Sequence, residues 1–324
     1  MKRALVLSGG GAKGAYQLGV LEGLLEQEPD LEYEVITGIS VGALNTSQLS
    51  QGKFKDMIQK LHHVWFDVVK GNGSIWTHHV LKYLIISVSG TLALTIAAFL
   101  TFILLAPQWV TILLALAAIG SLGFIYYVIN HTESIYDNAP LKRILKKNID
   151  LDALKNSGIE MRVGAVNYKT GEYESADQND PDIRAWVAAS SSFPVFFPLE
   201  KIRGHWYTDG GVRDVIPVAD AIKLGATHID VIATTPLKGT TTDKIDPIIG
   251  QIMRNIEIQS KEIQEDDLAM FKNSGVKFRI WMPEKKLTEN SLNFSPKSIR
   301  YMYQQGLESA KKGPTLVWNY EEES

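Results

Sequence analysis

The pentapeptide Gly38-Ile39-Ser40-Val41-Gly42 places a serine where it could act as a nucleophile. It matches GxSxG, follows an apolar strand-like run and leads into Ala43-Leu44-Asn45, which is typical of the start of a helix. A serine on a sharp turn between a strand and a helix is exposed for attack. The chemistry that this indicates is acyl transfer through a covalent acyl-serine.

A glycine-rich loop precedes this serine in the chain. The strand-like run Ala4–Leu7 enters Ser8-Gly9-Gly10-Gly11-Ala12-Lys13-Gly14, and a second helix-like segment follows. Such a loop offers backbone N–H groups to an anion. In acyl transfer, that anion would be the oxyanion formed when the serine attacks.

The mechanism also needs a general base. The best candidate is Asp209 in Trp206-Tyr207-Thr208-Asp209-Gly210-Gly211, a carboxylate at a glycine turn after an aromatic run. The two glycines would let this backbone pack tightly beside the serine. Taken alone, an Asp-Gly pair is also a common turn dipeptide.

At these three motifs the sequence resembles the patatin-like phospholipase family, whose signature is GGGxKG or GGGxRG, then GxSxG, then DGG or DGA. All three occur here in that order. The segments Ala189–Pro198 and Ile216–Val218 are similar to the family's serine-rich, proline-closed segment and to the stretch after DGG. Many members carry asparagine five residues after the aspartate, where this chain has Asp214.

The resemblance implies roles for individual residues. Ser40 would be the nucleophile and Asp209 its base, as a Ser-Asp dyad that requires no histidine. The backbone amides of Gly10, Gly11 and Ala12 would hold the oxyanion, with the positive charge of Lys13 nearby. Six further glycines would shape these turns: Gly9, Gly14, Gly38, Gly42, Gly210 and Gly211.

A different interpretation of the glycine loop is nucleotide binding. Gly9, Gly11 and Gly14 also satisfy GxGxxG, with Glu32 or Glu34 about twenty residues on as a ribose partner. This alternative leaves the GxSxG, the DGG and the serine-rich segment without a role.

Composition narrows the class of protein. The seven histidines do not occur in metal-ligand spacings, and the chain has no cysteine, so we expect no metal and no cofactor. A net charge of −3 argues against nucleic acid as a partner.

Residues 83–130 contain no Asp, Glu, Lys, Arg or His and are interrupted at Ala106-Pro107-Gln108. The two halves, Leu84–Leu105 and Trp109–Ile129, would each reach ~30 Å as a helix, which is the thickness of a hydrocarbon core. We therefore predict a transmembrane helical hairpin, with a shallow re-entrant hairpin or a pair of buried soluble helices as alternatives. Aromatic residues would lie at both membrane surfaces: Trp76, Tyr83, Tyr126 and Tyr127 near one surface, and Trp109 near the other.

The positions of Ser40 and Asp209 on either side of the hairpin require both to lie on the same side of the membrane. Lys82 precedes the first span, and four cations follow the second, so the positive-inside rule places the catalytic domain and both termini in the cytoplasm: Lys142, Arg143, Lys146 and Lys147. Glycines in the spans, Gly90, Gly120 and Gly123, would allow homo-oligomers through close helix packing.

The remaining sequence predicts a discontinuous α/β domain, 1–82 and 131–324, with the hairpin 83–130 inserted. Strand-like runs alternate with helical patterns, which favours a three-layer α/β/α sandwich with a mainly parallel sheet: Ala4–Leu7, Glu34–Thr37, Met161–Val166, Ile229–Ala233 and Lys277–Trp281. Tyr168–Gly171 reads as a hairpin turn, so part of the sheet should be antiparallel, and Ile248–Phe271 reads as a core-facing helix.

Together these features predict a membrane-anchored serine acyl hydrolase that cleaves acyl esters of membrane lipids, of phospholipase A or lysophospholipase type. A lipid transacylase with the same dyad and a non-hydrolytic nucleotide-binding membrane protein are the alternatives. Phe193, Phe196 and Phe197 would either line an acyl pocket or belong to the core.

Overall fold

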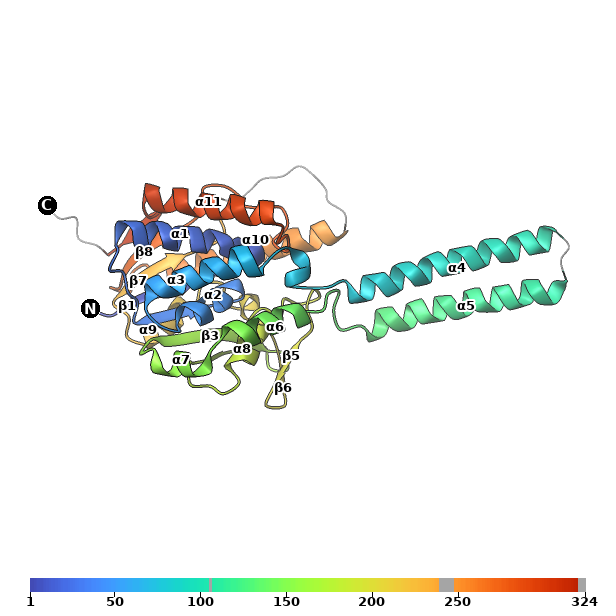
Figure 1. Cartoon of the computed structure of the whole chain (residues 1–324), viewed down its shortest axis with the longest axis horizontal. Coiled ribbons are helices and arrows are strands. Elements are labelled where there is room, and N and C mark those ends of the chain that lie inside the picture. The colour runs from blue at the N-terminus through green and yellow to red at the C-terminus, as the bar shows by residue number, and fades with distance from the viewer. Residues whose placement is uncertain (105–106, 239–247, 320–324) are drawn as a thin grey trace. The chain divides into compact units, whose positions relative to one another are not determined.

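The computed structural model describes residues 1–104, 107–238 and 248–319, in two compact units (Figure 1). The sheet unit comprises residues 1–75, 139–193 and 199–324, and the hairpin unit comprises residues 76–138 and 194–198. Leu105 and Ala106, at the end of the first predicted span and in its turn, lie outside the described residues.

A mixed sheet forms the centre of the sheet unit. Its strand order is β5-β6-β3-β2-β1-β7-β8-β9, with β4 also paired to β3. The five central strands are parallel, and the remaining strands pair in antiparallel fashion at the edges. The strands are β1 Arg3–Leu7, β2 Val35–Gly38, β3 Glu160–Asn167, β4 Tyr173–Ala176, β5 Glu200–Ile202, β6 His205–Asp209, β7 His228–Ile232, β8 Lys277–Trp281 and β9 Leu316–Trp318.

Helices cover both faces of this sheet, as the α/β/α prediction requires (Figure 1). The helices of the sheet unit are α1 Gly14–Gln27, α2 Val41–Leu49, α3 Phe54–His63, α6 Ala139–Asn148, α7 Leu151–Asn156, α8 Ile183–Ser190, α9 Val218–Lys223, α10 Ile248–Phe271 and α11 Pro296–Lys312. Single turns occur at η1 Gly11–Lys13, η2 Val64–Val68, η3 Asn72–Ser74 and η4 Gly210–Val212.

Strand β1 has apolar side chains that pack on both faces of the sheet, because successive strand residues face opposite sides. Ala4 and Val6 are buried in a core with Val218 of α9 and Leu268 of α10. Leu5 and Leu7 are fully buried on the other face. Apolar side chains on both faces explain why β1 lies at the centre of the sheet.

Helices α1 and α11 pack at very close range. A Cβ placed on Gly19 would lie 2.1 Å from the Tyr303 carbonyl oxygen, and one on Gly306 would lie 2.2 Å from that of Tyr16. Glycine at both positions therefore sets the distance between these two helices.

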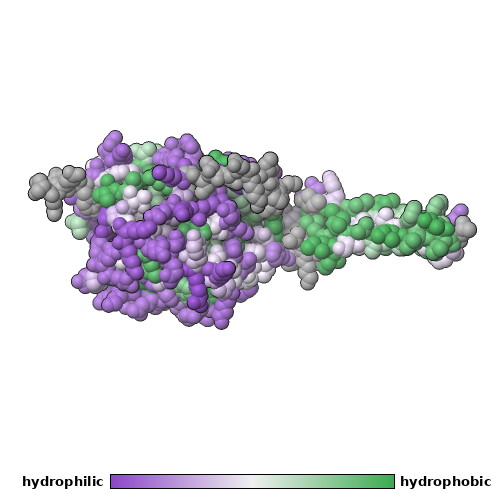
Figure 2. Space-filling view, turned by 90° about the horizontal axis from the view of Figure 1, so that it is seen from above, coloured by the Kyte–Doolittle hydropathy of each residue, from purple (hydrophilic) through white to green (hydrophobic). Residues whose placement is uncertain are grey.

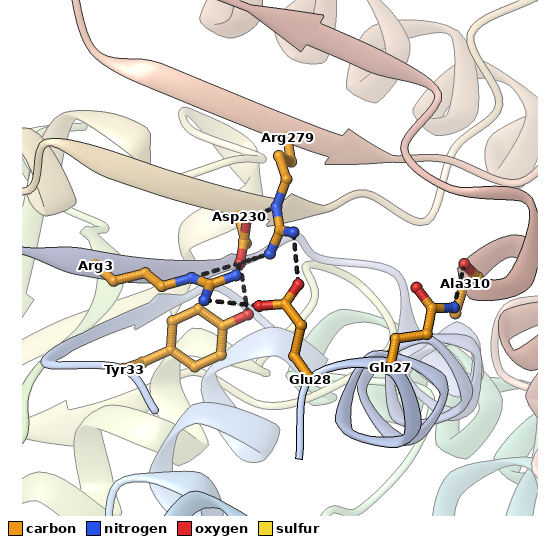
Figure 3. Close-up of polar contacts among 7 residues, drawn as sticks. All are labelled: Arg3, Gln27, Glu28, Tyr33, Asp230, Arg279 and Ala310. Atoms are coloured by element: carbon orange, nitrogen blue, oxygen red, sulfur yellow. Dashed lines mark hydrogen bonds and ion pairs between the residues drawn. The ribbon is translucent and has the colours of Figure 1, made fainter. Parts of the chain in front are cut away.

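A buried ion-pair network ties this layer to the sheet (Figure 3). Asp230 of β7 is 3% exposed and accepts hydrogen bonds from Arg3 Nη2 at 2.9 Å, Arg279 Nε at 2.7 Å and the Tyr33 hydroxyl at 2.7 Å. Both guanidinium groups also pair with Glu28, at 2.9 Å and 2.6 Å, just beyond the end of α1. The strands β1, β7 and β8 and the segment that follows α1 thus share one charge cluster.

The hairpin unit contains two long apolar helices, α4 His79–Ile103 and α5 Gln108–His131. Stretches of 21 residues in each, Tyr83–Ile103 and Gln108–Val128, are long and apolar enough to cross a membrane, by length and composition only. Figure 2 shows apolar side chains covering these helices, and Phe99 and Trp109 are 63% and 65% exposed. A pair of helices in a soluble core would bury such side chains.

The base of the hairpin unit joins its three chain segments. Thr77 and Asp137 pair as a β-bridge, and the rings of Trp76 and Tyr136 stack with centroids 4.2 Å apart. The Tyr136 N–H donates to the Phe196 carbonyl at 2.9 Å, which fixes segment 194–198 to the end of the hairpin.

The predicted strands and the turn at Tyr168–Gly171 are confirmed to within one residue at each end, and Ile248–Phe271 is helical. Ile263 and Phe271 pack against the apolar core, so α10 does face inward. The sequence did not predict the edge strands β5 and β9 or the strand β6 beside β5.

Candidate active site

Ser40 lies at the junction of β2 and α2, with φ 56° and ψ −125°. Its carbonyl already accepts the Ala43 N–H at 2.9 Å, so the helix begins directly after the serine. A positive φ is strained for a residue with a side chain and is typical of a nucleophile elbow. The sequence therefore forms the predicted strand-turn-helix, with Ser40 half-buried at its apex.

The glycines of GxSxG permit this sharp turn. A Cβ on Gly38 would lie 2.4 Å from the Gly42 carbonyl oxygen, and one on Gly42 would lie 2.2 Å from that of Leu7. Both distances are far below van der Waals contact. Any larger residue would separate α2 from β1 and displace Ser40.

The serine-rich segment at the end of α8 holds the elbow from the other side. The Ser40 N–H donates to the Ser190 hydroxyl at 2.9 Å, and the Ser191 hydroxyl donates to the Ser40 carbonyl at 3.2 Å. The Ser192 carbonyl accepts the Asp209 N–H at 3.0 Å. One three-residue segment thus contacts the backbones of both Ser40 and Asp209.

Asp209 ends β6 and is 1% exposed. Its Oδ1 accepts the Gly211 N–H at 2.8 Å. Burial raises the pKa of Asp209 to about 7, and the Gly211 N–H and the nearby Ser40 hydroxyl partly offset this increase. Within the described residues Oδ2 has no hydrogen-bond partner at standard geometry, so the Ser40 hydroxyl approaches the carboxyl without a fully formed hydrogen bond.

Gly210 brings this carboxyl close to the sheet. A Cβ at Gly210 would lie 2.6 Å from the Gly164 carbonyl oxygen of β3, whereas one at Gly211 would meet only Oδ1 of Asp209, at 3.1 Å, and more distant atoms. Of the two glycines of the DGG motif, Gly210 is thus the one that packing requires.

The glycine loop lies beside the serine, since a Cβ at Gly9 would be 3.4 Å from the Ser40 Cβ. Gly10 and Gly11 have φ of 151° and 59°, which favour glycine. In the described part of the chain, the N–H groups of Gly10 and Gly11 donate to no acceptor. Thr234, after β7, fixes the loop by donating its hydroxyl to the Gly9 carbonyl at 2.5 Å.

Ala12 differs from the two glycines before it. Its N–H donates to the Ser291 carbonyl at 2.7 Å, and a Cβ on Gly11 would lie 2.3 Å from the same oxygen. Of the three amides expected to bind an oxyanion, the one of Ala12 is therefore engaged within the protein. Ser291 lies between β8 and α11, and no motif in this region indicates that it contacts the glycine loop.

Lys13 extends its side chain along the same loop, next to Gly10. Its Cε would lie 3.2 Å from a Cβ at Gly10, so the side chain folds back along the loop. Burial lowers the pKa of Lys13 to about 8, Glu257 raises it and Lys286 lowers it. With a pKa of about 8, the amino group is mostly protonated at neutral pH.

The sequence profile of the patatin-like phospholipases matches residues 5–222, a stretch that contains Ser40, Asp209 and the glycine loop. The chain belongs to the patatin-like phospholipase family. It is therefore a lipid acyl hydrolase. A search of curated protein sequences finds no match.

Solved structures similar to this patatin-like phospholipase include VipD from Legionella pneumophila, at 15% identity and a TM-score of 0.41, covering 98% of this chain and 68% of VipD. Another is the type III effector protein ExoU, at 14% identity and a TM-score of 0.38, covering 96% of this chain. This chain spans about half the length of the ExoU chain, 52%.

Asp214, where many patatin-like phospholipases have asparagine, follows the DGG turn and donates its N–H to the Gly210 carbonyl at 3.1 Å. Burial, Asp267 and Asp220 raise the pKa of Asp214 well above its usual range. Its carboxyl faces that of Asp267, which accepts the Val215 N–H at 3.2 Å.

The three phenylalanines that follow α8 are divided between the two units. Phe193 belongs to the sheet unit, whereas Phe196 and Phe197 belong to the hairpin unit. There both are buried, and each ring centroid lies 6.1 Å from that of Tyr136. Their packing is that of core residues. Among the described residues, no group of three or more His, Asp or Glu side chains could hold a metal ion.

Proposed function

We propose that this patatin-like phospholipase is a membrane-anchored enzyme of phospholipase A or lysophospholipase type that acts through a Ser40-Asp209 dyad. One observation carries the proposal: the Ser40 hydroxyl lies next to a buried carboxyl whose pKa, raised by burial to about 7, suits a general base at neutral pH. The amides of Gly10 and Gly11 beside the serine support it, because they donate to no acceptor among the described residues and can bind the oxyanion that its attack creates.

In the first half of the reaction, Asp209 accepts the proton of the Ser40 hydroxyl as its oxygen attacks the ester carbonyl. The negative charge that develops on the carbonyl oxygen is held by the Gly10 and Gly11 amides and by the charge of Lys13. Collapse of this intermediate transfers the proton from Asp209 to the leaving lyso-lipid or alcohol, and the acyl group stays on Ser40.

In the second half, Asp209 activates a water molecule that attacks the acyl-serine. The same amides hold the second oxyanion, and fatty acid leaves when the Ser40 oxygen takes back the proton. Each amide that holds the oxyanion lowers the barrier by ~3 kcal/mol. Two such amides and a base of matched pKa account for catalysis without a histidine.

The hairpin unit acts as the anchor. Two stretches of 21 apolar residues with exposed side chains match the thickness of a bilayer. Anchoring raises the concentration of lipid ester around the site. The cluster of cations on α6, including Lys142 and Lys146, supports a cytoplasmic position of the sheet unit.

The direct test is product analysis with the full chain reconstituted in phosphatidylcholine vesicles. Wild type should release fatty acid and lysophosphatidylcholine, and Ser40→Ala should release none. Transfer of the acyl chain to a second lipid, without release of free fatty acid, would show that the enzyme is a transacylase and not a hydrolase. Equal release by wild type and Ser40→Ala would refute the dyad.

A further inference from the structure

A small apolar pocket lies in the sheet unit against α2, the helix that follows Ser40. Its volume is about 60 Å³. The walls come from α2, from α3 and η2, and from α6, and they include Leu44, Leu61, Trp65, Ile75, Leu141 and Ile144. This cavity is large enough for about five water-sized groups, since one such group needs ~10–15 Å³.

Four of the polar side chains at this pocket, those of Asn45, Ser47, Trp65 and Asn148, already have partners in the protein. Asn45 Nδ2 donates to Gln17 Oε1 at 2.8 Å and to the Gly14 carbonyl at 3.2 Å. Its Oδ1 accepts the Trp65 Nε1–H at 3.1 Å, which fixes the indole as one wall. The Asn148 side chain donates to the Ile144 carbonyl at 2.9 Å. A hydrocarbon is therefore a better ligand for this pocket than a polar group, because it requires no hydrogen bonds.

The pocket is connected to the candidate nucleophile through one turn of helix. The Leu44 N–H donates to the Ser40 carbonyl at 3.2 Å, and the Leu44 side chain lines the pocket. An acyl group on Ser40 begins its hydrocarbon chain at the start of this helix. Further along the same helix, Asn45, Ser47 and Gln48 line this pocket, so the pocket extends along α2 from Leu44.

The pocket also lies where the hairpin is inserted in the chain. Ile75 is the last residue before the hairpin unit, and Leu141 follows shortly after it ends at Asn138. The Leu141 N–H donates to the Ile75 carbonyl at 3.3 Å. The two chain segments that lead into and out of the hairpin unit therefore meet at the pocket wall. The segments through which the anchor is attached thus supply part of this apolar surface.

We infer that this pocket binds the acyl chain of the substrate and sets its preferred length. The inference rests on the proposed function, in which the acyl group is carried by Ser40. Its limited volume accepts only a few methylene groups. Each methylene that enters should raise kcat/KM about fourfold, and methylenes beyond that limit should add little.

The test compares p-nitrophenyl esters from butyryl to dodecanoyl with the full chain in mild detergent. Ile144 is half-buried at the pocket and can be enlarged or reduced. Ile144→Trp should lower the ratio of kcat/KM for the octanoyl over the butyryl ester at least tenfold. Ile144→Ala should move the optimum to longer chains by one or two carbons.

Lys147→Trp is the matched control, because it adds the same ring on an exposed position of α6 outside the pocket. It should leave the octanoyl-to-butyryl ratio at the wild-type value. The inference is wrong if Ile144→Trp keeps that ratio or if it lowers both esters equally.

A second experiment does not depend on turnover. A diazirine-bearing fatty acid should photo-cross-link the Ser40→Ala chain, and peptide mapping should find the label on α2, α3 or α6. Ile144→Trp should reduce that label several-fold. Labelling confined to the hairpin helices would overturn the inference about the pocket, even if the enzyme hydrolyses esters. Labelling of α2 in a protein without Ser40-dependent hydrolysis would refute only the proposed function.

Discussion

The backbone N–H of Ser40 donates to the hydroxyl of Ser190 at 2.9 Å, across the junction of two helices that are far apart in sequence. Ser190 is fully buried, and the hydroxyl of its neighbour Ser191 donates to the Ser40 carbonyl. The strained elbow at φ 56° is therefore held at both its donor and its acceptor. Because Ser192 also binds the backbone of Asp209, the segment sets the spacing of the two groups.

Removal of the Ser190 hydroxyl tests this arrangement. Ser190→Ala leaves the half-buried Ser40 N–H without its acceptor, which costs about 1 kcal/mol, and lets the elbow relax. We expect kcat to fall about tenfold or more with little change in KM, in assays of lipid ester hydrolysis. Ser157→Ala, which removes a hydroxyl at the end of α7, is the control and should keep the wild-type kcat. A wild-type kcat in Ser190→Ala would show that the bond does not position Ser40.

The raised pKa of Asp209 predicts how activity depends on pH. The carboxyl must be ionised to accept the Ser40 proton, and burial raises its pKa from 3.8 to about 7. The kcat/KM should therefore fall about tenfold per pH unit below pH 7 and level off above it. A profile that stays flat down to pH 5 would contradict the assignment of Asp209 as base.

The same shift has a consequence for stability. Between pH 4 and pH 7 the folded protein holds a proton on Asp209 that the unfolded chain has lost, so this group makes the free energy of unfolding decrease as pH rises. Asp209→Asn removes this dependence. Thermal denaturation should show the variant to be more stable than wild type at pH 8, by up to about 4 kcal/mol, and much closer to wild type at pH 4. If the variant and wild type are equally stable at pH 4 and at pH 8, the Asp209 carboxyl ionises in the folded protein without cost.

The network around Asp230 predicts a loss of stability distant from the chemistry. Asp230→Asn would leave the guanidinium groups of Arg3 and Arg279 with Glu28 as their remaining acidic partner. Loss of one partner in a buried ion pair costs about 3–5 kcal/mol. Asp30→Asn, at an exposed position, is the control. Urea denaturation should separate the two variants by that amount, and a difference under 1 kcal/mol would show that the network is not stabilising.

The absence of cysteine in the chain makes the membrane topology easy to test. Single cysteines can be placed at Lys147 on α6 and at Gln108, where α5 begins. In intact cells a membrane-impermeant maleimide should label Gln108→Cys, and Lys147→Cys only after permeabilisation. A Gln108→Cys variant that resists labelling from outside would favour a re-entrant hairpin.

Much of this fold could be predicted because its signals are local. Each central strand is a short apolar run bounded by turns, and the motif residues Ser40 and Asp209 each stand on their own glycine turn. The edge strands β5 and β9 could not be predicted, since three residues carry too little periodicity. The contacts that complete the site are long-range: Ser190 approaches Ser40, and Ser291 binds the Ala12 N–H, only after the chain has folded.

Covalent labelling with a fluorophosphonate tests whether Ser40 is a nucleophile that Asp209 activates. The full chain in native membranes or mild detergent should be labelled at Ser40, while Ser40→Ala and Asp209→Asn should lose the label and remain folded by circular dichroism. A folded wild type that stays unlabelled, or an Asp209→Asn variant labelled at the wild-type rate, would contradict the dyad.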